Sequence, residues 1–264
     1  MRAADHPYFD TQLPVGLAHR GGAKLAANRH VENTLAAFRT AVDLGYRYLE
    51  TDVHATTDGA LLAFHDSRLD RVTDATGVIA ELPYAAVRDA RVGGSEEIPL
   101  LSHLLEELPE ACFNIDVKSA GAIGPLVRTI REHAAIDRVC VGSFSPRRLW
   151  TVRRALGPRL ATAAGQVGVA AMRFSPAFVS RWLSTPSPVL QIPTEHVVRG
   201  RRIELVTPAL VTAVHGLGKH LHVWTVDDED EMHRLLDLGV DGLVSDRIDT
   251  LAEVLAQRGV PLRA

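Results

Sequence analysis

The chain has 264 residues, of which 46% are hydrophobic and 23% are charged, enough for the core of one α/β barrel. Its net charge of −3 gives no overall basic field, so neither nucleic acid nor an anionic membrane is an expected partner. No segment approaches the roughly 18 uninterrupted apolar residues of a membrane span, and residues 1–15 lack a signal-peptide core. Cys112 and Cys140 lie in apolar runs, which predicts buried free thiols. These features favour a cytoplasmic globular protein without stable membrane insertion.

Strands and helices are predicted to alternate along the chain. Residues 15–18 and 46–54 read as strands, and between them Asn33 is a suitable N-cap and Gly45 a suitable end for a helix. Such a strand–helix–strand unit implies a parallel sheet. Further strands are predicted at 112–118, 138–142, 160–164, 189–192, 221–225 and 242–245. Further helices are predicted at 99–108, 124–133, 146–156, within 169–183, and at 208–217, 229–238 and 251–257.

A hairpin is predicted after the second strand. Asp58-Gly59 separates two apolar runs, and the returning arm ends at His65. If this arm projects above the sheet, the parallel strands number about eight, as a closed (β/α)₈ TIM barrel requires. Residues 67–97 are polar and break the alternation, so we expect them to be a small insertion at the barrel mouth, within a single domain over 1–264.

Polar residues follow the predicted strands at their C-terminal ends, where barrel enzymes carry their active sites. Glu50 and Asp52 are two apart and share one side of a strand, and the hairpin places His65 roughly opposite Glu50. Two carboxylates beside an imidazole suit a hard divalent metal with an acid–base group. Asn114, Asp116 and Lys118 also alternate, and an inward charged row is costly unless it is paired or binds an ion.

An ordered set of short motifs runs through the chain. The motifs are His19-Arg20-Gly21, Glu32-Asn33-Thr34, Glu50-x-Asp52, Asp58-Gly59, His65-Asp66, Asn114-x-Asp116-x-Lys118, Trp224-Thr225 and Asp241-Gly242-x-x-Ser245-Asp246. In this order they resemble the glycerophosphodiester phosphodiesterase family of the PLC-like phosphodiesterases, over about residues 15–250. The resemblance implies a TIM barrel with a small insertion after the His-Asp pair. It also implies metal-dependent hydrolysis of a small glycerophosphodiester to glycerol 3-phosphate and an alcohol.

The resemblance assigns the metal and acid–base roles. Glu50, Asp52 and Asp116 would bind Mg²⁺ or Ca²⁺, because carboxylate oxygens suit hard cations. His19 and His65 would be the acid–base pair, which a group with an ordinary pKa near 6.5 can provide at neutral pH. One would deprotonate the nucleophile and the other would protonate the leaving alkoxide, in an order that the residues do not specify.

The resemblance also assigns the substrate contacts. Arg20 and Lys118 would hold the phosphate, the arginine by its planar fork and the lysine as a point charge. Trp224 and Phe144 would line the pocket for the glycerol or the leaving group. The family implies that the nucleophile is the glycerol 2-hydroxyl, which gives a cyclic phosphate that water then opens.

Two positions depart from the family pattern. Asp116 stands where the family usually has Glu, which moves the metal closer to that strand or introduces a bridging water. Val31 stands where proline usually precedes the Glu-Asn-Thr motif. The loop at 23–30, with Lys24, is longer than a typical βα loop, and it either covers the phosphate or is simply solvated.

Structural interpretations remain beside the functional ones. Asp116 and Lys118 could form an ion pair inside the barrel, and Trp224 could be plain core. His222 shares a face with Trp224, and we expect it to be a hydrogen-bonded core histidine. The basic run at 199–202 is expected to be solvated, with a contact to an acidic ligand or a subunit as the alternative. The apolar helix faces are all needed for barrel packing, so they indicate no oligomeric state.

Three other functions are alternatives to the hydrolysis of a small glycerophosphodiester. A lysophospholipase D would need an apolar groove for a lipid-like diester. The insertion could supply it through apolar residues that could instead form its own small core: Val72, Val78, Ile79, Leu82 and Tyr84. A non-catalytic phosphate- or metal-binding barrel is disfavoured because both histidines and all three carboxylates are present. A metal-independent lyase of the phosphatidylinositol phospholipase C type is disfavoured by the three carboxylates.

Overall fold

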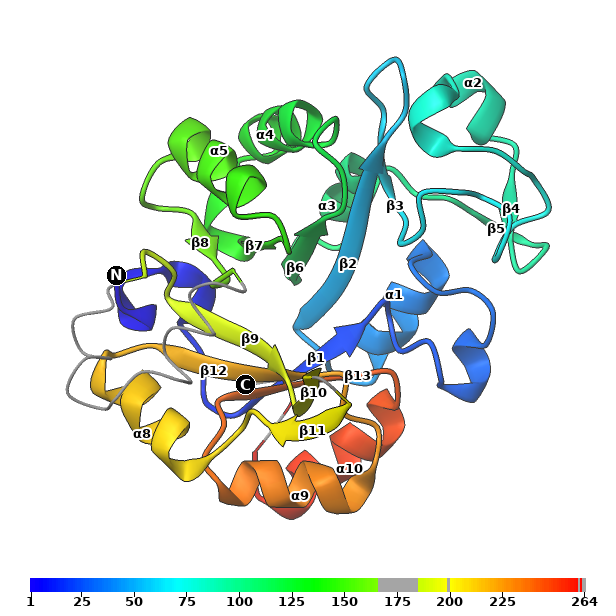
Figure 1. The fold of residues 1–264 in the computed structure, drawn as a ribbon. Coiled ribbons are helices and arrows are strands. Elements are labelled where there is room, and N and C mark those ends of the chain that lie inside the picture. The colour runs from blue at the N-terminus through cyan, green and yellow to red at the C-terminus, as the bar shows by residue number, and fades with distance from the viewer. Residues whose placement is uncertain (166–184, 199, 261, 263–264) are drawn as a thin grey trace.

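The computed structural model describes residues 1–165, 185–198, 200–260 and 262 (Figure 1). Within this part of the chain, parallel strands form a barrel wall in the order β8–β7–β6–β2–β1–β13–β12–β9. A parallel bridge joins Ala163 to Val189, next to a 2.8 Å hydrogen bond from Ala164 N to Val189 O, and links β8 to β9. The wall strands are β1 (Val15–His19), β2 (Tyr48–Ala55), β6 (Cys112–Val117), β7 (Val139–Gly142), β8 (Ala161–Thr162), β9 (Val189–Pro193), β12 (His220–Trp224) and β13 (Gly242–Ser245). The expected eight-stranded (β/α)₈ barrel is confirmed.

Helices follow the strands around the outside of the barrel (Figure 1). They are α1 (Leu35–Asp43), α3 (Leu101–Glu107), α4 (Ile123–Glu132), α5 (Pro146–Leu156), α8 (Pro208–Gly216), α9 (Glu229–Asp237) and α10 (Ile248–Gln257). Short 3₁₀ turns are η3 (Ala26–Asn28) and η5 (Ala135–Arg138). The helix predicted within 169–183 lies outside the described residues. No helix in the described part of the chain is both long and apolar enough to cross a membrane.

The N-cap predicted for α1 is wrong by one residue. Thr34, not Asn33, caps the helix, because the Thr34 side chain accepts a hydrogen bond from Ala37 N at 3.2 Å. Asn33 has a positive φ of 60°, a conformation that asparagine tolerates better than most residues. Its side chain turns toward the barrel and donates to Asp52 Oδ2 at 3.2 Å. The residue is therefore part of the polar interior.

β2 is buried along its whole length because both faces are covered, as in other parallel barrels. Leu49 and Val53 belong to the core between the strands and the helices. Tyr48 belongs to a second core inside the barrel. Glu50 and Asp52 continue the alternation of Tyr48, and both line the cavity above it. The strand pattern thus places the two carboxylates on one side, as predicted.

The predicted hairpin stands above the barrel. β3 (Leu61–Ala63) pairs antiparallel with the last residues of β2, with Val53 opposite Ala63, and joins no other wall strand. The turn closes with a 3.1 Å hydrogen bond from Gly59 N to Thr56 O, and Gly59 has a φ of 83°, which suits glycine. The arm therefore delivers His65 to the barrel mouth without adding a wall strand.

Residues 67–97 form the expected insertion, on the side of the hairpin (Figure 1). Its short elements are η4 (Ile79–Glu81), α2 (Tyr84–Val87), β4 (Arg91–Val92) and β5 (Glu96–Glu97). Leu69, Ile79 and Val92 bury themselves against the hairpin residues Leu62 and Phe64 in a separate small core. Most of the apolar residues of the insertion are consumed by this core.

The first residues of the chain close the floor of the barrel. They form η1 (Ala3–Asp5) and η2 (Pro7–Phe9). Tyr8 and Phe9 are buried among inward-facing strand residues. Tyr48 Oη donates to Tyr8 O at 2.7 Å. Cavity space is therefore left at the opposite end, above the C-terminal ends of the strands.

Candidate active site

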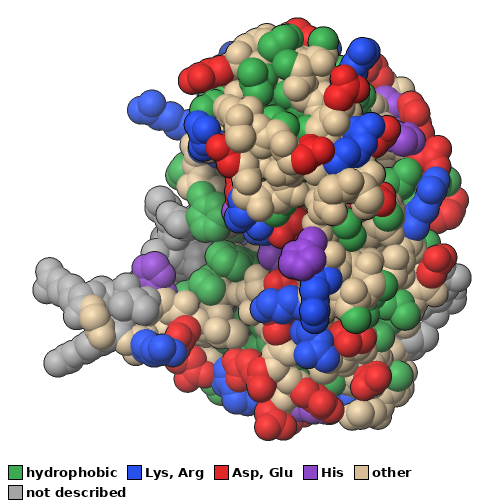
Figure 2. Space-filling model, turned by 90° about the vertical axis from the view of Figure 1, so that its right-hand side faces the viewer, with side chains coloured by type: hydrophobic (Ala, Val, Ile, Leu, Met, Phe, Trp, Pro, Cys, Tyr) green, Lys and Arg blue, Asp and Glu red, His purple; other side chains and the backbone are tan. Residues whose placement is uncertain are grey.

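A cavity of about 610 Å³ opens at the C-terminal ends of the barrel strands. Basic, acidic and histidine side chains gather beside a hollow in the space-filling view (Figure 2). Every residue predicted for the site lines this cavity: His19, Arg20, Glu50, Asp52, His65, Asp116, Lys118, Phe144 and Trp224. The prediction that Glu50 and His65 face one cavity is therefore confirmed.

His19 ends β1 and is held by residues from both neighbouring strands. Its Nδ1 lies 2.6 Å from Asp246 Oδ1, just after β13, and its Nε2 lies 3.7 Å from Glu50 Oε2. Burial alone would lower the pKa of His19, but the Glu50 and Asp246 carboxylates outweigh it and raise the pKa above its ordinary value. Asp246 therefore fixes the ring so that Nε2 faces the cavity.

His65, which follows β3, is held by an aspartate in the same manner. Its Nδ1 lies 2.6 Å from Asp66 Oδ1. Because a carboxylate occupies Nδ1, Nε2 is the nitrogen left to exchange a proton with a bound molecule. In both histidines, an aspartate thus holds Nδ1 and leaves Nε2 as the nitrogen for proton exchange.

Asp52 is the centre of a buried charge cluster. Lys118 Nζ lies 2.9 Å from Asp52 Oδ1 and 2.7 Å from Asp116 Oδ2. On its other oxygen, Asp52 lies 3.1 Å from Arg20 Nε and accepts from Asn33 Nδ2 at 3.2 Å. Burial would raise the pKa of Asp52, but Lys118 and Arg20 outweigh it and lower the pKa. Asp52 is therefore an anion whose two cationic neighbours also face the cavity.

The three predicted metal ligands lie on adjacent strands, but they do not converge. In the part of the chain that the structure describes, no three His, Cys, Asp or Glu side chains form a group that could hold a metal ion. Lys118 bridges Asp52 and Asp116, while Glu50 is 7% exposed and its Oε2 lies 3.7 Å from His19 Nε2. Burial and the charge of Asp52 raise the pKa of Glu50, so a cation beside it would favour its ionised form. Carboxylate oxygens are the donors that a hard divalent cation prefers, but the three groups would have to move together around such an ion.

Arg20 sits in a strained, well-anchored turn. It has a φ of 51°, which is uncommon for a residue with a side chain. Its backbone N donates to Glu50 O at 3.0 Å, and Asn33 N donates to Arg20 O at 2.9 Å. Its Nη1 donates to Glu32 Oε1 at 3.2 Å. The Glu-Asn-Thr motif therefore positions Arg20 from both its backbone and its guanidinium.

The opposite wall of the cavity is apolar. Phe144 and Trp224 meet edge to face at 5.8 Å, and Lys118 Nζ lies 5.9 Å from the Phe144 ring centre. Trp224 is half-buried, packing against the barrel interior while also lining the cavity, so it is not plain core. Ile203 and Leu205 extend this wall.

Part of this wall was not predicted. β10 (Glu195–Val198) and β11 (Arg201–Glu204) form an antiparallel hairpin, and His196 and Ile203 from it line the cavity. The available signal was Gly200 between two short runs that contain β-branched residues, Val197 and Val198 before it and Ile203 after it. Arg202 is exposed and pairs with Glu195 within the hairpin at 2.9 Å, which fits the solvated interpretation of the basic run.

Other expectations can be placed. Lys24 does not line the cavity; it is exposed and its Nζ lies 2.6 Å from Asp227 Oδ2. Asp227 in turn accepts a hydrogen bond from Asp246 N at 2.8 Å, so Lys24 supports the aspartate that holds His19.

His222 is buried as expected, but the expected hydrogen bonds are absent, because neither ring nitrogen has a partner among the described residues. Cys112 and Cys140 are buried free thiols, as predicted.

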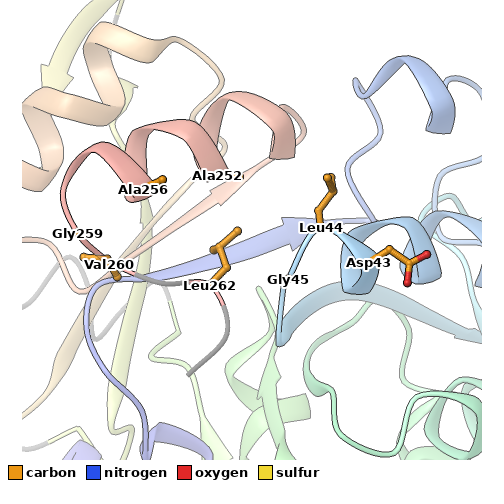
Figure 3. Close-up of a pocket in the computed structure, with 8 residues that line it drawn as sticks. All are labelled: Asp43, Leu44, Gly45, Ala252, Ala256, Gly259, Val260 and Leu262. Carbon is orange, nitrogen blue, oxygen red and sulfur yellow. The ribbon is translucent and has the colours of Figure 1, made fainter.

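A second hollow lies away from these groups. It runs between the ends of α1 and α10 and is lined by Asp43, Leu44, Gly45, Ala252, Ala256, Gly259, Val260 and Leu262 (Figure 3). Asp43 is the one ionisable side chain in this lining. Such a lining lacks an acid–base pair, so the cavity at the strand ends is the candidate active site.

Comparison with known proteins agrees with this geometry. The glycerophosphoryl diester phosphodiesterase family profile matches residues 19–250. The probable glycerophosphodiester phosphodiesterase 2 of Mycobacterium tuberculosis is 39% identical over 249 residues, covering 93% of this chain and 92% of its own. The rat lysophospholipase D GDPD1 is 26% identical, covering 90% and 85%. An Oleispira antarctica phosphodiesterase, solved with the product sn-glycerol-3-phosphate, superposes with a TM-score of 0.76 and 25% identity, covering 92% and 97%.

Proposed function

We propose that this protein hydrolyses glycerophosphodiesters to glycerol 3-phosphate and an alcohol, because the chain belongs to the glycerophosphoryl diester phosphodiesterase family and its cavity carries the groups that this reaction needs. The observation that carries the proposal is the matched anchoring of two histidines. His19 and His65 line one cavity, and each holds its Nδ1 2.6 Å from an aspartate.

The two histidines would share the proton transfers. A neutral imidazole accepts the proton of the attacking hydroxyl at Nε2, and a protonated one gives its proton to the leaving oxygen as the phosphorus–oxygen bond breaks. Asp246 and Asp66 stabilise the protonated rings of His19 and His65. The attacking hydroxyl is either the glycerol 2-hydroxyl, through a cyclic phosphate, or water.

The phosphate would lie between the histidines, against Arg20 and Lys118. Both cations line the cavity and are held by buried carboxylates, so they need little reorganisation when a phosphate enters. Glu50, Asp52 and Asp116 would hold Mg²⁺ or Ca²⁺, which when bound polarises the phosphoryl oxygen and offsets its developing charge.

The test is a panel of diesters assayed with and without EDTA. Purified protein is incubated with glycerophosphocholine, glycerophosphoethanolamine and glycerophosphoglycerol, and glycerol 3-phosphate is measured. We expect turnover that EDTA abolishes and that Mg²⁺ or Ca²⁺ restores. Folded, metal-supplied protein that turns over no diester would refute the proposal. Activity that persists in EDTA and stops at a cyclic phosphate would instead identify a metal-independent lyase.

A lipid-like diester is the second candidate substrate, as in a lysophospholipase D. The observation that favours it is the apolar wall of Phe144, Trp224, Ile203 and Leu205 facing the charged side of the cavity. The insertion packs most of its apolar residues into its own core, and none of its residues lines this cavity. Release of choline from lysophosphatidylcholine at a kcat/KM above that for glycerophosphocholine would support this candidate. Turnover of glycerophosphocholine alone would exclude it.

A further inference from the structure

Arg71 lies in the insertion, outside every motif that predicted the site. Its guanidinium grips two carboxylates at once. Nε and Nη2 donate to Asp66 at 2.5 and 3.3 Å, and Nη2 and Nη1 donate to Glu32 at 2.6 and 3.2 Å. Two paired contacts of this kind use the planar fork of arginine, which an ammonium group cannot reproduce.

Each carboxylate that Arg71 grips holds a residue of the candidate site. Asp66 holds His65 through its Nδ1 at 2.6 Å. Glu32 accepts from Arg20 Nη1 at 3.2 Å. An unbroken series of contacts therefore runs from His65 through Asp66, Arg71 and Glu32 to Arg20. Its two ends, His65 and Arg20, are 45 positions apart in the sequence.

The insertion fixes the backbone that carries Arg71. Leu69 is fully buried in the small core of the insertion, and Val72 packs against the same core. Gly93 N donates to Val72 O at 3.0 Å, and Thr73 Oγ1 donates to Leu69 O at 2.8 Å. The residues on both sides of Arg71 are thus held, so its side chain reaches the site from a rigid support.

Arg71 balances the negative charges of Asp66 and Glu32. Burial alone would raise the pKa of Asp66, but hydrogen bonds from Arg71 and His65 hold it at about 2. Burial would likewise raise the pKa of Glu32, but Arg71 and Arg20 lower it. Without Arg71, two carboxylates would face the site with one cationic partner fewer. Their hold on His65 and Arg20 would then be less well defined.

We propose that Arg71 is a positioning residue that couples His65 to Arg20. It acts through Asp66 and Glu32 and touches neither the substrate nor the metal. The small core of the insertion then has a function in the reaction, because it holds the guanidinium that aligns the acid–base group with the phosphate site. This inference rests on the proposed phosphodiesterase function.

The test compares Arg71→Gln and Arg71→Lys with a matched control, Arg68→Gln. Arg68 lies in the same loop, is exposed, and pairs only with Asp70 among the described residues, at 3.0 Å. We expect Arg71→Gln to lower kcat/KM by about 10- to 100-fold, the range for residues that orient a site from behind. Arg71→Lys should recover only part of this loss, and Arg68→Gln should match the wild type.

Double variants separate positioning from a general structural role. Arg71→Gln should lower kcat in the wild type but not in an Asp66→Asn background, and should raise KM in the wild type but not in a Glu32→Gln background. Equal losses in all backgrounds, full rescue by lysine, or no loss in Arg71→Gln would each overturn the proposal. If Arg71→Gln unfolds, as judged by thermal unfolding, the cycles are run with Arg71→Lys.

A measurement without substrate separates this proposal from the proposed function. The ¹⁵N signals of the His65 imidazole report its contact with Asp66 whether or not any diester is hydrolysed. We expect Arg71→Gln to shift them and Arg68→Gln to leave them in place. Unchanged signals in Arg71→Gln would refute the coupling even if the enzyme is active. If the wild type hydrolyses no diester but Arg71→Gln still shifts the His65 signals, the coupling stands and the proposed function is refuted.

Discussion

Replacing Asp246 with asparagine tests whether the anchoring of His19 matters for the chemical step. Asp246 Oδ1 lies 2.6 Å from His19 Nδ1, and its side chain is 14% exposed, so solvent screens this contact only weakly. Asparagine keeps the shape but removes the charge that stabilises the protonated ring. Its amide can also donate to Nδ1, which favours the tautomer with the proton on Nε2, the wrong one for a base.

The size of the effect follows from one hydrogen bond to a charged group. Such bonds contribute about 1.5–3 kcal/mol. If the bond strengthens as the ring becomes protonated in the transition state, its loss lowers kcat about 10- to 150-fold. Asp246 does not line the cavity, so the KM for the diester should change little. The expected signature of Asp246→Asn is therefore a fall in kcat with KM nearly constant.

The assay is steady-state release of glycerol 3-phosphate from glycerophosphocholine. Asp249→Asn is the matched control, because Asp249 lies three residues further on and pairs with Arg247 at 3.1 Å at the surface. We expect the control to retain wild-type kcat. A wild-type kcat in Asp246→Asn, or a loss carried entirely by KM, would refute the role given to this contact.

Three further outcomes are expected. Lys118→Met removes the cation that Asp52 and Asp116 share and that would contact the phosphate. The KM for the diester should therefore rise about 10- to 100-fold, and an unchanged KM would exclude a contact between Lys118 and the phosphate. Burial and a neighbouring histidine lower the pKa of His222 from 6.5 to about 3, so the fold keeps it neutral while the unfolded chain takes up a proton as the pH falls below 6.5. Protonation of the unfolded chain should therefore lower the free energy of unfolding by about 2 kcal/mol between about pH 7 and pH 5. His222→Leu should remove this pH dependence, measured by urea unfolding, and an equally steep fall of the unfolding free energy with pH in the variant would contradict the prediction. Ile203→Asp should suppress turnover of lysophosphatidylcholine and spare that of glycerophosphocholine, whereas parallel losses would count against an acyl-chain wall.

The positions of the strands could be predicted from local patterns in the sequence, and the residues that line the cavity from their places after the strands and from the ordered family motifs. Apolar runs separated by amphipathic stretches predicted the wall strands to within two residues at each end. The two-residue spacing of Glu50 and Asp52 predicted their shared face, and the Asp-Gly turn predicted the return of the chain to His65. Strand alternation and turn chemistry act over a few residues, so a linear reading captures them.

Only the tertiary structure decided which groups hold the site residues. His19 and Asp246 are 227 positions apart, and they meet because β1 pairs with β13 when the barrel closes. Asn33 was predicted as a helix cap, but its side chain is drawn to Asp52 instead. Arg71 belongs to a segment with no periodicity, and its position depends on the core that the insertion forms with the hairpin. Ion pairs between distant segments depend on how whole elements pack, and no local pattern in the sequence encodes that.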